Sequence, residues 1–379
     1  MVRQMPNGQQ SGGVRATESR CASTDGAAFA DASPGTTVAV ANVQPCWTCA
    51  QCGTADGSMP RSKHPRERPW ALVLAGGDGR RLQDLTRKIA GAPIPKQYCR
   101  IVGDHSLLEA TLARIAPLVP RGRTLVVVNR NHLDLALPQL SDIPPGNVVA
   151  QPGNRDTGPG IVLGLLHLAA RRPRTPVVVF PSDHYMDNAS IFRAQVERAT
   201  LLVDRLPTMI ALLGIRPTHP EPALGYIEPG PRLIVPGLES PAAYGVAAFH
   251  EKPSVELAAT LQRTGGLWNS FVMVFHASRL LALLRQRRGA DVERLRGVLC
   301  SGAGYENVPS WNFSADFLTR IPDQLAVVPL EGVSWSDWGT PQAVERTLAA
   351  LRDARRPTGM ALPGMRSPGK ETHEHGCRC

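Results

Sequence analysis

Short β-rich segments alternate with amphipathic helical segments through the middle of this chain, over about residues 68–355. The predicted strands are Ala71–Ala75, Thr124–Asn129, Val148–Gln151, Val177–Phe180 and Met209–Gly214, and helices are predicted near residues 106–117, 158–171 and 189–205. This alternation predicts an α/β fold with a Rossmann-like, mostly parallel mixed sheet flanked by helices. Such sheets bind ligands at the carboxyl ends of their strands, so the residues after each strand are the first candidates for function.

The two ends of the chain differ from this middle part in composition. Residues 1–67 are rich in Gly, Ser, Thr, Ala, Gln and Pro, show no strand or helix period, and end in a basic linker. Such a segment cannot bury enough apolar surface to offset the entropy of ordering. We therefore predict a disordered extension over residues 1–67, a globular domain over 68–355 and a flexible tail over 356–379.

The chain is basic, with 42 Lys and Arg against 32 Asp and Glu among 379 residues. This balance suits nucleic acid, an anionic surface or a phosphorylated substrate. Nucleic acid is disfavoured, because the basic runs carry no interleaved aromatics and no known nucleic-acid motif is present. No apolar run approaches the ~18–20 residues of a membrane helix, and no signal peptide is visible. We therefore expect a cytoplasmic protein that is not integral to a membrane.

Two cysteine-containing clusters lie near the ends of the chain. One holds Cys46, Cys49 and Cys52, and the other holds His373, His375, Cys377 and Cys379. Together they could supply soft ligands to zinc, but neither has paired CxxC spacing. Incidental thiols in flexible segments are the favoured interpretation, and the role of both clusters stays open.

The clearest chemical motif follows the first predicted strand, in the segment Leu74–Leu82, which reads Leu-Ala-Gly-Gly-Asp-Gly-Arg-Arg-Leu. Glycines let the backbone turn sharply and approach a ligand closely, and successive N–H groups in such a turn can hold an anion. Lys96 follows Pro93 and Pro95, in a chain with only five lysines. A lysine can act as a point cation for phosphate, although the motif taken alone is equally compatible with a surface lysine.

Together these two motifs resemble the signature of sugar-1-phosphate nucleotidylyltransferases, most closely the mannose-1-phosphate guanylyltransferases. The resemblance continues in order through further segments, namely Gln151–Pro159, Phe180–His184, Leu213–Glu221, Gly225–Ile227, Glu251–Pro253, Leu267–Ser270 and Trp335–Gly339. Several ordered motifs are far more specific than any one of them. The resemblance implies an enzyme that joins GTP, or another nucleoside triphosphate, to a sugar-1-phosphate. It also allows a homodimer, whereas the sequence does not fix the oligomeric state.

The resemblance also implies roles for individual residues. The catalytic residues would be Arg81, on the leaving pyrophosphate, Lys96, near the α-phosphate, and Asp183. Nucleotide binding would fall to Leu74, Ala75, Gly76, Gly77, Gly79, Arg80, Gln151, Asp156, Thr157 and Gly158. Sugar-phosphate binding would fall to Gly225, Glu251, Lys252 and Asn269. Asp183 and Asp337 would hold Mg²⁺, which prefers carboxylates together with phosphate oxygens.

Some positions depart from the family's usual pattern, and other functions remain open. Asp156 and Gly158 replace the usual Asn and Ala, and Phe271 stands where guanylyltransferases usually have glycine, adding bulk beside the expected sugar pocket. The alternatives are a transferase for another sugar-1-phosphate or for UTP or dTTP, and a sugar-nucleotide sensor without catalysis. Asp183 taken alone could also be a helix N-cap.

Overall fold

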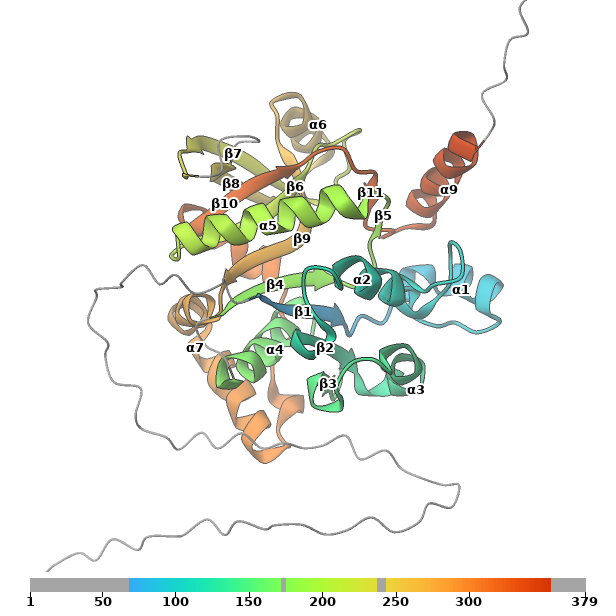
Figure 1. The fold of residues 1–379 in the computed structure, drawn as a ribbon, viewed down its shortest axis with the longest axis vertical. Coiled ribbons are helices and arrows are strands. Elements are labelled where there is room, and N and C mark those ends of the chain that lie inside the picture. Colours follow the sequence, from blue (N-terminus) through green and yellow to red (C-terminus); the bar gives the residue numbers. More distant parts are fainter. Residues whose placement is uncertain (1–67, 172–174, 237–242, 356–379) are drawn as a thin grey trace, which may run out of the picture. The chain divides into compact units, whose positions relative to one another are not determined.

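The computed structural model describes residues 68–171, 175–236 and 243–355. The predicted extension at 1–67, the predicted tail at 356–379 and both cysteine-containing clusters lie outside the described residues. Within the described residues the α/β architecture is the one expected (Figure 1).

The described chain is built around a nine-stranded sheet with the order β3-β2-β1-β4-β9-β6-β10-β8-β7. Its strands are β1 (Trp70–Ala75), β2 (Thr124–Asn129), β3 (Val148–Gln151), β4 (Pro176–Pro181), β6 (Ile210–Ile215), β7 (Gly225–Leu233), β8 (Ala243–Glu251), β9 (Leu267–His276) and β10 (Leu325–Leu330). The five predicted strands match β1, β2, β3, β4 and β6 to within one residue at each end. A separate two-stranded ribbon pairs β5 (Tyr185–Met186) with β11 (Trp335–Ser336).

The sheet is more mixed than the expected mostly parallel arrangement. Parallel pairing joins β1 to β2 and β4, β2 to β3, and β6 to β10. Strand β9 runs antiparallel to both β4 and β6, and β7 and β8 form an antiparallel pair. Antiparallel strands need no helical crossover, so the strand–helix alternation that predicts parallel pairing does not extend to residues 225–276.

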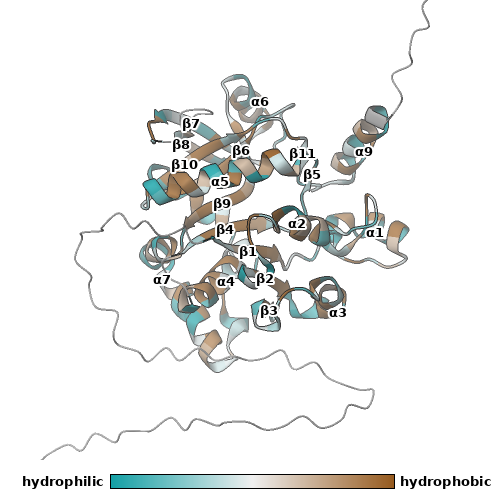
Figure 2. Cartoon of the chain, viewed as in Figure 1, coloured by the Kyte–Doolittle hydropathy of each residue, from teal (hydrophilic) through white to brown (hydrophobic). Residues whose placement is uncertain are grey.

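Two apolar clusters, one on each face of the sheet, form the core. Leu72 belongs to one cluster and its neighbour Val73 to the other, because successive strand residues point to opposite faces. Helices α4 (Thr157–Arg171) and α7 (Ala277–Ser301) cover the first face, and α2 (Leu107–Ile115) and α5 (Ala189–Arg205) cover the second. Figure 2 shows this arrangement: the central strands are hydrophobic, and α5 and α7 are amphipathic, with hydrophobic and hydrophilic sides.

Helix α2 begins with the capping box that its sequence predicts. The Ser106 hydroxyl accepts a hydrogen bond from the Glu109 N–H at 3.1 Å, and the Glu109 carboxylate accepts one from the Ser106 N–H at 2.7 Å. The predicted helices near 158–171 and 189–205 are α4 and α5. No helix among the described residues is long and apolar enough to span a bilayer.

A third, smaller apolar cluster lies beside the sheet, around the fully buried Trp338. Its indole N–H donates to the Thr347 hydroxyl of α9 (Pro341–Arg355) at 3.0 Å, and its ring stacks on Tyr185 with a centroid separation of 5.4 Å. Leu82, at the end of the glycine-rich segment, belongs to the same cluster. The remaining helices are α1 (Gln83–Ala90), α3 (Leu133–Ala136), α6 (Val255–Arg263) and α8 (Phe313–Asp316).

Gly164 allows α4 to approach the sheet, which gives a test of this packing. A Cβ at this position would lie 2.4 Å from Leu72 Cδ1 and 3.1 Å from Val127 Cγ2. We expect Gly164→Ala to lower the free energy of unfolding by about 1–3 kcal/mol, as overpacked cores do. Gly297→Ala in α7, where a Cβ meets nothing within 4 Å, should instead raise it by about 0.5–1 kcal/mol. Urea denaturation measures both, and equal effects would contradict the packing described here.

Candidate active site

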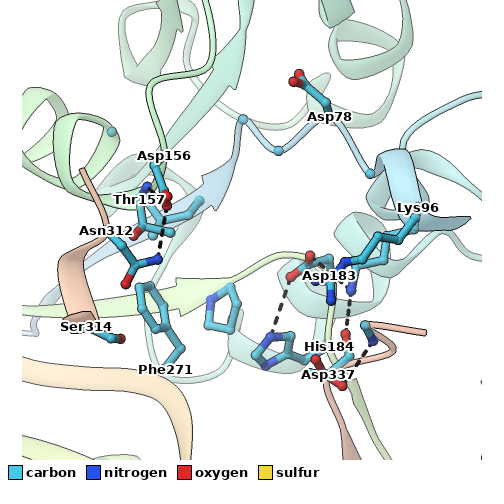
Figure 3. A pocket seen from close by; sticks show the side chains of 18 of the residues that line it. Asp78, Lys96, Asp156, Thr157, Asp183, His184, Phe271, Asn312, Ser314 and Asp337 are labelled. Carbon is cyan, nitrogen blue, oxygen red and sulfur yellow. Dashed lines mark hydrogen bonds and ion pairs between the residues drawn. The ribbon is translucent and has the colours of Figure 1, made fainter. Parts of the chain in front are cut away.

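A cavity of about 700 Å³ opens at the carboxyl ends of the parallel strands β1, β3 and β4. It is lined by most of the residues that the sequence suggested, namely Leu74, Gly76, Gly77, Gly79, Arg80, Arg81, Lys96, Gln151, Asp156, Thr157, Asp183, Gly225, Glu251, Asn269 and Asp337. We call this cavity the cleft. Figure 3 shows its polar walls, which come from segments far apart in the sequence.

The glycine-rich loop after β1 is held in place by the segment around Lys96. The Gln97 side chain donates hydrogen bonds to the carbonyls of Ala75 at 3.1 Å and Gly77 at 2.7 Å. Gly79 has a φ of 62°, and a Cβ there would lie 3.0 Å from the backbone of both Pro95 and Lys96. Only glycine fits such a close approach in this conformation. The two motifs are therefore one structural unit.

Asp78, within the same loop, ties it to the neighbouring strands. Its carboxylate accepts hydrogen bonds from Asn129 at the end of β2 and from Asn154 beyond β3, both at 3.2 Å. The Arg80 guanidinium lies 3.7 Å from the same carboxylate. Asp78 thus spans three strand ends and limits movement of the loop relative to them.

The Lys96 side chain, only 11% exposed, connects two further segments of the cleft wall. Its ammonium lies 3.3 Å from the Asp183 carboxylate and donates hydrogen bonds to the carbonyls of Asp337 and Trp338. An ammonium has three N–H donors, and here each has an acceptor. Lys96 therefore holds the segments of Asp183 and Asp337 together, and Asp337 lies 241 residues beyond Lys96 in the sequence.

The Asp183 carboxyl is ionised in this setting. Burial in the cleft is the largest single influence and opposes its ionisation, but the Lys96 ammonium, the neighbouring His184 and hydrogen bonds to the carboxylate together outweigh burial, so the pKa of Asp183 lies below its ordinary value. Burial lowers the pKa of the neighbouring His184, which is therefore neutral at pH 7. Asp183 is not a helix N-cap, because α5 begins at Ala189 and is capped by Asn188.

Asp337 forms the other carboxylate on this wall, and together with Asp183 it suits a hard cation. Its Oδ1 accepts a hydrogen bond from the Gly339 N–H at 3.0 Å, which orients the side chain. No cluster of three or more His, Cys, Asp or Glu among the described residues could enclose a metal ion. Two carboxylates alone fit Mg²⁺ well, since this ion keeps several waters and takes phosphate oxygens to complete its shell.

The loop after β3 meets a segment around residues 310–314 that the sequence did not single out. The Asn312 amide donates to the Asp156 carboxylate at 3.2 Å, and the Phe313 N–H donates to the Thr157 hydroxyl at 2.9 Å. Gly158 donates its N–H to the Trp311 carbonyl, and a Cβ at 158 would lie 2.3 Å from the Trp311 ring. The glycine that replaces the usual alanine at 158 thus allows Trp311 to fill that space.

Gly225, Glu251 and Asn269 form the part of the wall next to β7, β8 and β9. Gly225 pairs with Glu251 in the sheet, and a Cβ at 225 would lie 2.7 Å from Glu251 Oε2 and 3.5 Å from Asn269 Cβ. Burial raises the pKa of Glu251 above its ordinary value, against the attraction of the Lys252 ammonium 3.6 Å away. The Lys252 side chain is 59% exposed and does not line the cleft.

Two other predicted residues are likewise absent from the lining of the cleft. Ala75 is buried beneath the glycine-rich loop, and Gly158 is covered by Trp311. Lining residues that lay outside the predicted set include Asp78, His184, Asn312, Ser314 and Phe271. Asp78 and His184 were within reach, since each lies inside a motif already quoted. Asn312 and Ser314 carry no such signal, because their segment reads as an ordinary polar and aromatic stretch.

The mixed sheet, with a glycine-rich loop and a polar cleft at the carboxyl ends of its parallel strands, can be compared with known proteins. The family model described as "Nucleotidyl transferase" matches residues 70–353. The chain belongs to this family, which confirms the resemblance found in its sequence.

Among individual relatives, two are named mannose-1-phosphate guanylyltransferases. The chain is 32% identical over 292 residues to mannose-1-phosphate guanylyltransferase 2 of Escherichia coli O157:H7, and 33% identical over 289 residues to mannose-1-phosphate guanylyltransferase ManC of Salmonella typhimurium strain LT2. Each match covers 72% of this chain but only 58% of the relative. A solved structure described as mannose-1-phosphate geranyltransferase from Thermus thermophilus superimposes with a TM-score of 0.65 at 32% identity, covering 75% of this chain and 80% of its own. The expected fold class is thereby confirmed.

The raised pKa of Glu251 predicts a pH-dependent effect on stability. Between the ordinary pKa of glutamate and its raised value, the folded state binds more protons than the unfolded state, so rising pH destabilises the fold. Glu251→Gln removes this penalty. We expect the variant to match the wild type near pH 4 and to gain in free energy of unfolding, relative to it, as pH rises to 7.

Glu256→Gln, at the exposed start of α6, is a control for which we expect the opposite change of stability with pH. Hydrogen bonds from its own backbone N–H and from Ser254 lower the pKa of Glu256, so its charge stabilises the fold above the ordinary pKa and this contribution is lost as pH falls. Urea denaturation from pH 4 to 7 measures both variants. A Glu251→Gln difference that shrinks as pH rises would contradict the assignment.

Proposed function

We propose that this protein joins GTP and mannose-1-phosphate to form GDP-mannose and pyrophosphate. The observation that carries the proposal is the convergence of Arg81, Lys96, Asp183 and Asp337 on one cleft. The proposed substrates are inferred from the names of the relatives, and the chain spans little more than half of the length of these relatives. In this reaction a phosphate oxygen of the sugar phosphate attacks the α-phosphorus in line and pyrophosphate leaves.

Both reactants are polyanions, so the protein's main task is to align them and to offset their charge. The glycine-rich loop offers backbone N–H groups to the triphosphate, and Arg80 and Arg81, both exposed at its end, reach the departing pyrophosphate. Gln151, Asp156 and Thr157 line the cleft next to this loop, where the nucleobase would lie. Glu251 and Asn269 offer acceptors and a donor to the sugar hydroxyls.

Asp183 and Asp337 would hold Mg²⁺, which supplies charge neutralisation to phosphate oxygens when bound. Lys96 keeps these carboxylates on one wall through its bonds to both segments. Its positive charge also lowers the repulsion that an incoming phosphate meets beside two carboxylates. We therefore assign Lys96 a positioning role together with an electrostatic one.

Two specific observations favour testing other substrates as well. Asp156 places a carboxylate, and Phe271 an aromatic ring, on the cleft wall at positions that depart from the guanylyltransferase pattern. A transferase for another sugar-1-phosphate or for UTP or dTTP is therefore the second candidate. Cytoplasmic location and a homodimer stay predictions.

The proposal is tested first by measuring pyrophosphate release for GTP, UTP, dTTP and ATP, each paired with mannose-1-phosphate and glucose-1-phosphate, with Mg²⁺ present. Asp183→Asn should keep the fold and lower kcat by about 10²-fold or more, as does loss of one strong electrostatic contact. The exposed Asp142→Asn, outside the cleft, is the matched control and should leave kcat unchanged. Wild-type turnover in Asp183→Asn would remove Asp183 from the site.

Lys96→Ala should lower kcat by about 10²-fold, because it removes a charge and releases the Asp337 segment. Lys88→Ala removes an exposed lysine from α1 and controls for loss of overall charge. Steady-state kinetics measure kcat and KM separately for both variants. Unchanged kcat with a raised KM would show that Lys96 only binds substrate, and unchanged values of both would refute its assigned role.

A further inference from the structure

Phe271 has a backbone conformation that is unusual for its side chain. Its φ is 60°, in the left-handed region, where an aromatic residue is strained and glycine is not. The conformation is held by local hydrogen bonds: the Phe271 N–H donates to Asn269 Oδ1 at 3.0 Å, and the Ser270 hydroxyl donates to the Leu213 carbonyl at 2.6 Å. A strained residue that is held this firmly points to a functional position.

The strain coincides with an irregularity of the sheet. Between β9 and β6 the pairing passes from Asn269 with Gly214 to Met273 with Leu212, so β9 holds two more residues than its partner over this stretch. A bulge of this kind redirects a side chain and is common next to active sites. Here it turns the ring of Phe271 into the cleft, as Figure 3 shows.

Phe271 lies next to the sugar end of the cleft. Met273 pairs with Val179 of β4, so Phe271 is two residues nearer the carboxyl end of that strand, which leads to Asp183. Asn269 precedes it by two residues and lies near Gly225 and Glu251. Asn312 and His184 line the same cleft as Phe271, and all three are labelled in Figure 3.

We propose that Phe271 is a specificity-determining residue whose ring forms an apolar wall of the sugar subsite. The inference rests on the proposed function and deepens it. A pyranose presents C–H groups on its faces and hydroxyls at its rim, so a ring on one side with Glu251 and Asn269 beside it matches both kinds of surface. A bulky polar substituent directed at the ring would collide with it or lose its hydration without a replacement partner.

The ring is only partly buried, and its inner side packs against the apolar cluster of α4 and α7. Packing alone does not require the left-handed backbone, because Phe275 on the same strand packs in that cluster with no exposed surface and without a positive φ. We therefore relate the strained backbone of Phe271 to the side of the ring that faces the cleft, and not to its packing in the core. A glycine at this position would fit the backbone without strain but would leave the subsite wider.

Phe271→Gly keeps the backbone conformation and removes the ring. The readout is kcat/KM for glucose-1-phosphate and for N-acetylglucosamine-1-phosphate, two sugars that differ only in the substituent at C2, using the nucleoside triphosphate on which the wild type is most active. We expect the variant to raise the ratio of the second value to the first by about tenfold or more, the scale on which pocket size discriminates. A smaller change in this ratio, or equal losses for both sugars, would overturn the proposal.

Two further variants separate specificity from stability. Phe271→Asn also tolerates a positive φ and should shift the ratio in the same direction if Phe271→Gly does not fold. Phe275→Leu perturbs the core on the same strand and should leave the ratio unchanged. If the wild type releases pyrophosphate with none of the sugar phosphates, the proposed function fails. If it does turn over and the ratio does not move, the role of Phe271 alone fails.

Discussion

The ammonium of Lys96 is the interaction on which the cleft depends. It joins the segment beside the glycine-rich loop to Asp183 after β4 and to the carbonyls of residues 337 and 338. These three pieces are distant in sequence, and they meet around this one side chain. A buried ammonium without acceptors would be costly, so the chain gains both a satisfied cation and a fixed arrangement of two carboxylates.

The sequence was informative wherever local signals and the fold agree. Strands β1 to β4 and helices α2, α4 and α5 follow from hydrophobic periodicity and from the capping box at Ser106. The insertion of β9 between β4 and β6 could not be foreseen, because pairing direction depends on partners far away in the chain. For the same reason the sequence could not show that Asn312 bonds to Asp156, nor that Lys252 is absent from the lining of the cleft.

Backbone strain in the described residues gathers around the cleft. The non-glycine residues with positive φ are Asp156, Lys252, Phe271 and Trp338. Asp156 and Phe271 line the cleft together with Trp338, and Lys252 directly follows Glu251. Each costs stability that a regular strand or turn would not, and each is offset by contacts elsewhere in the fold.

Trp338 links the final described helix, α9, to the cleft. Its side chain is fully buried and donates a hydrogen bond to Thr347 of α9, and its carbonyl accepts a hydrogen bond from Lys96. The final described helix, α9, therefore supports the residue whose carbonyl accepts a hydrogen bond from the Lys96 ammonium. The smallest fragment of this protein that could retain an ordered cleft must therefore extend into α9 at least as far as Thr347, and cannot stop where the sheet is complete.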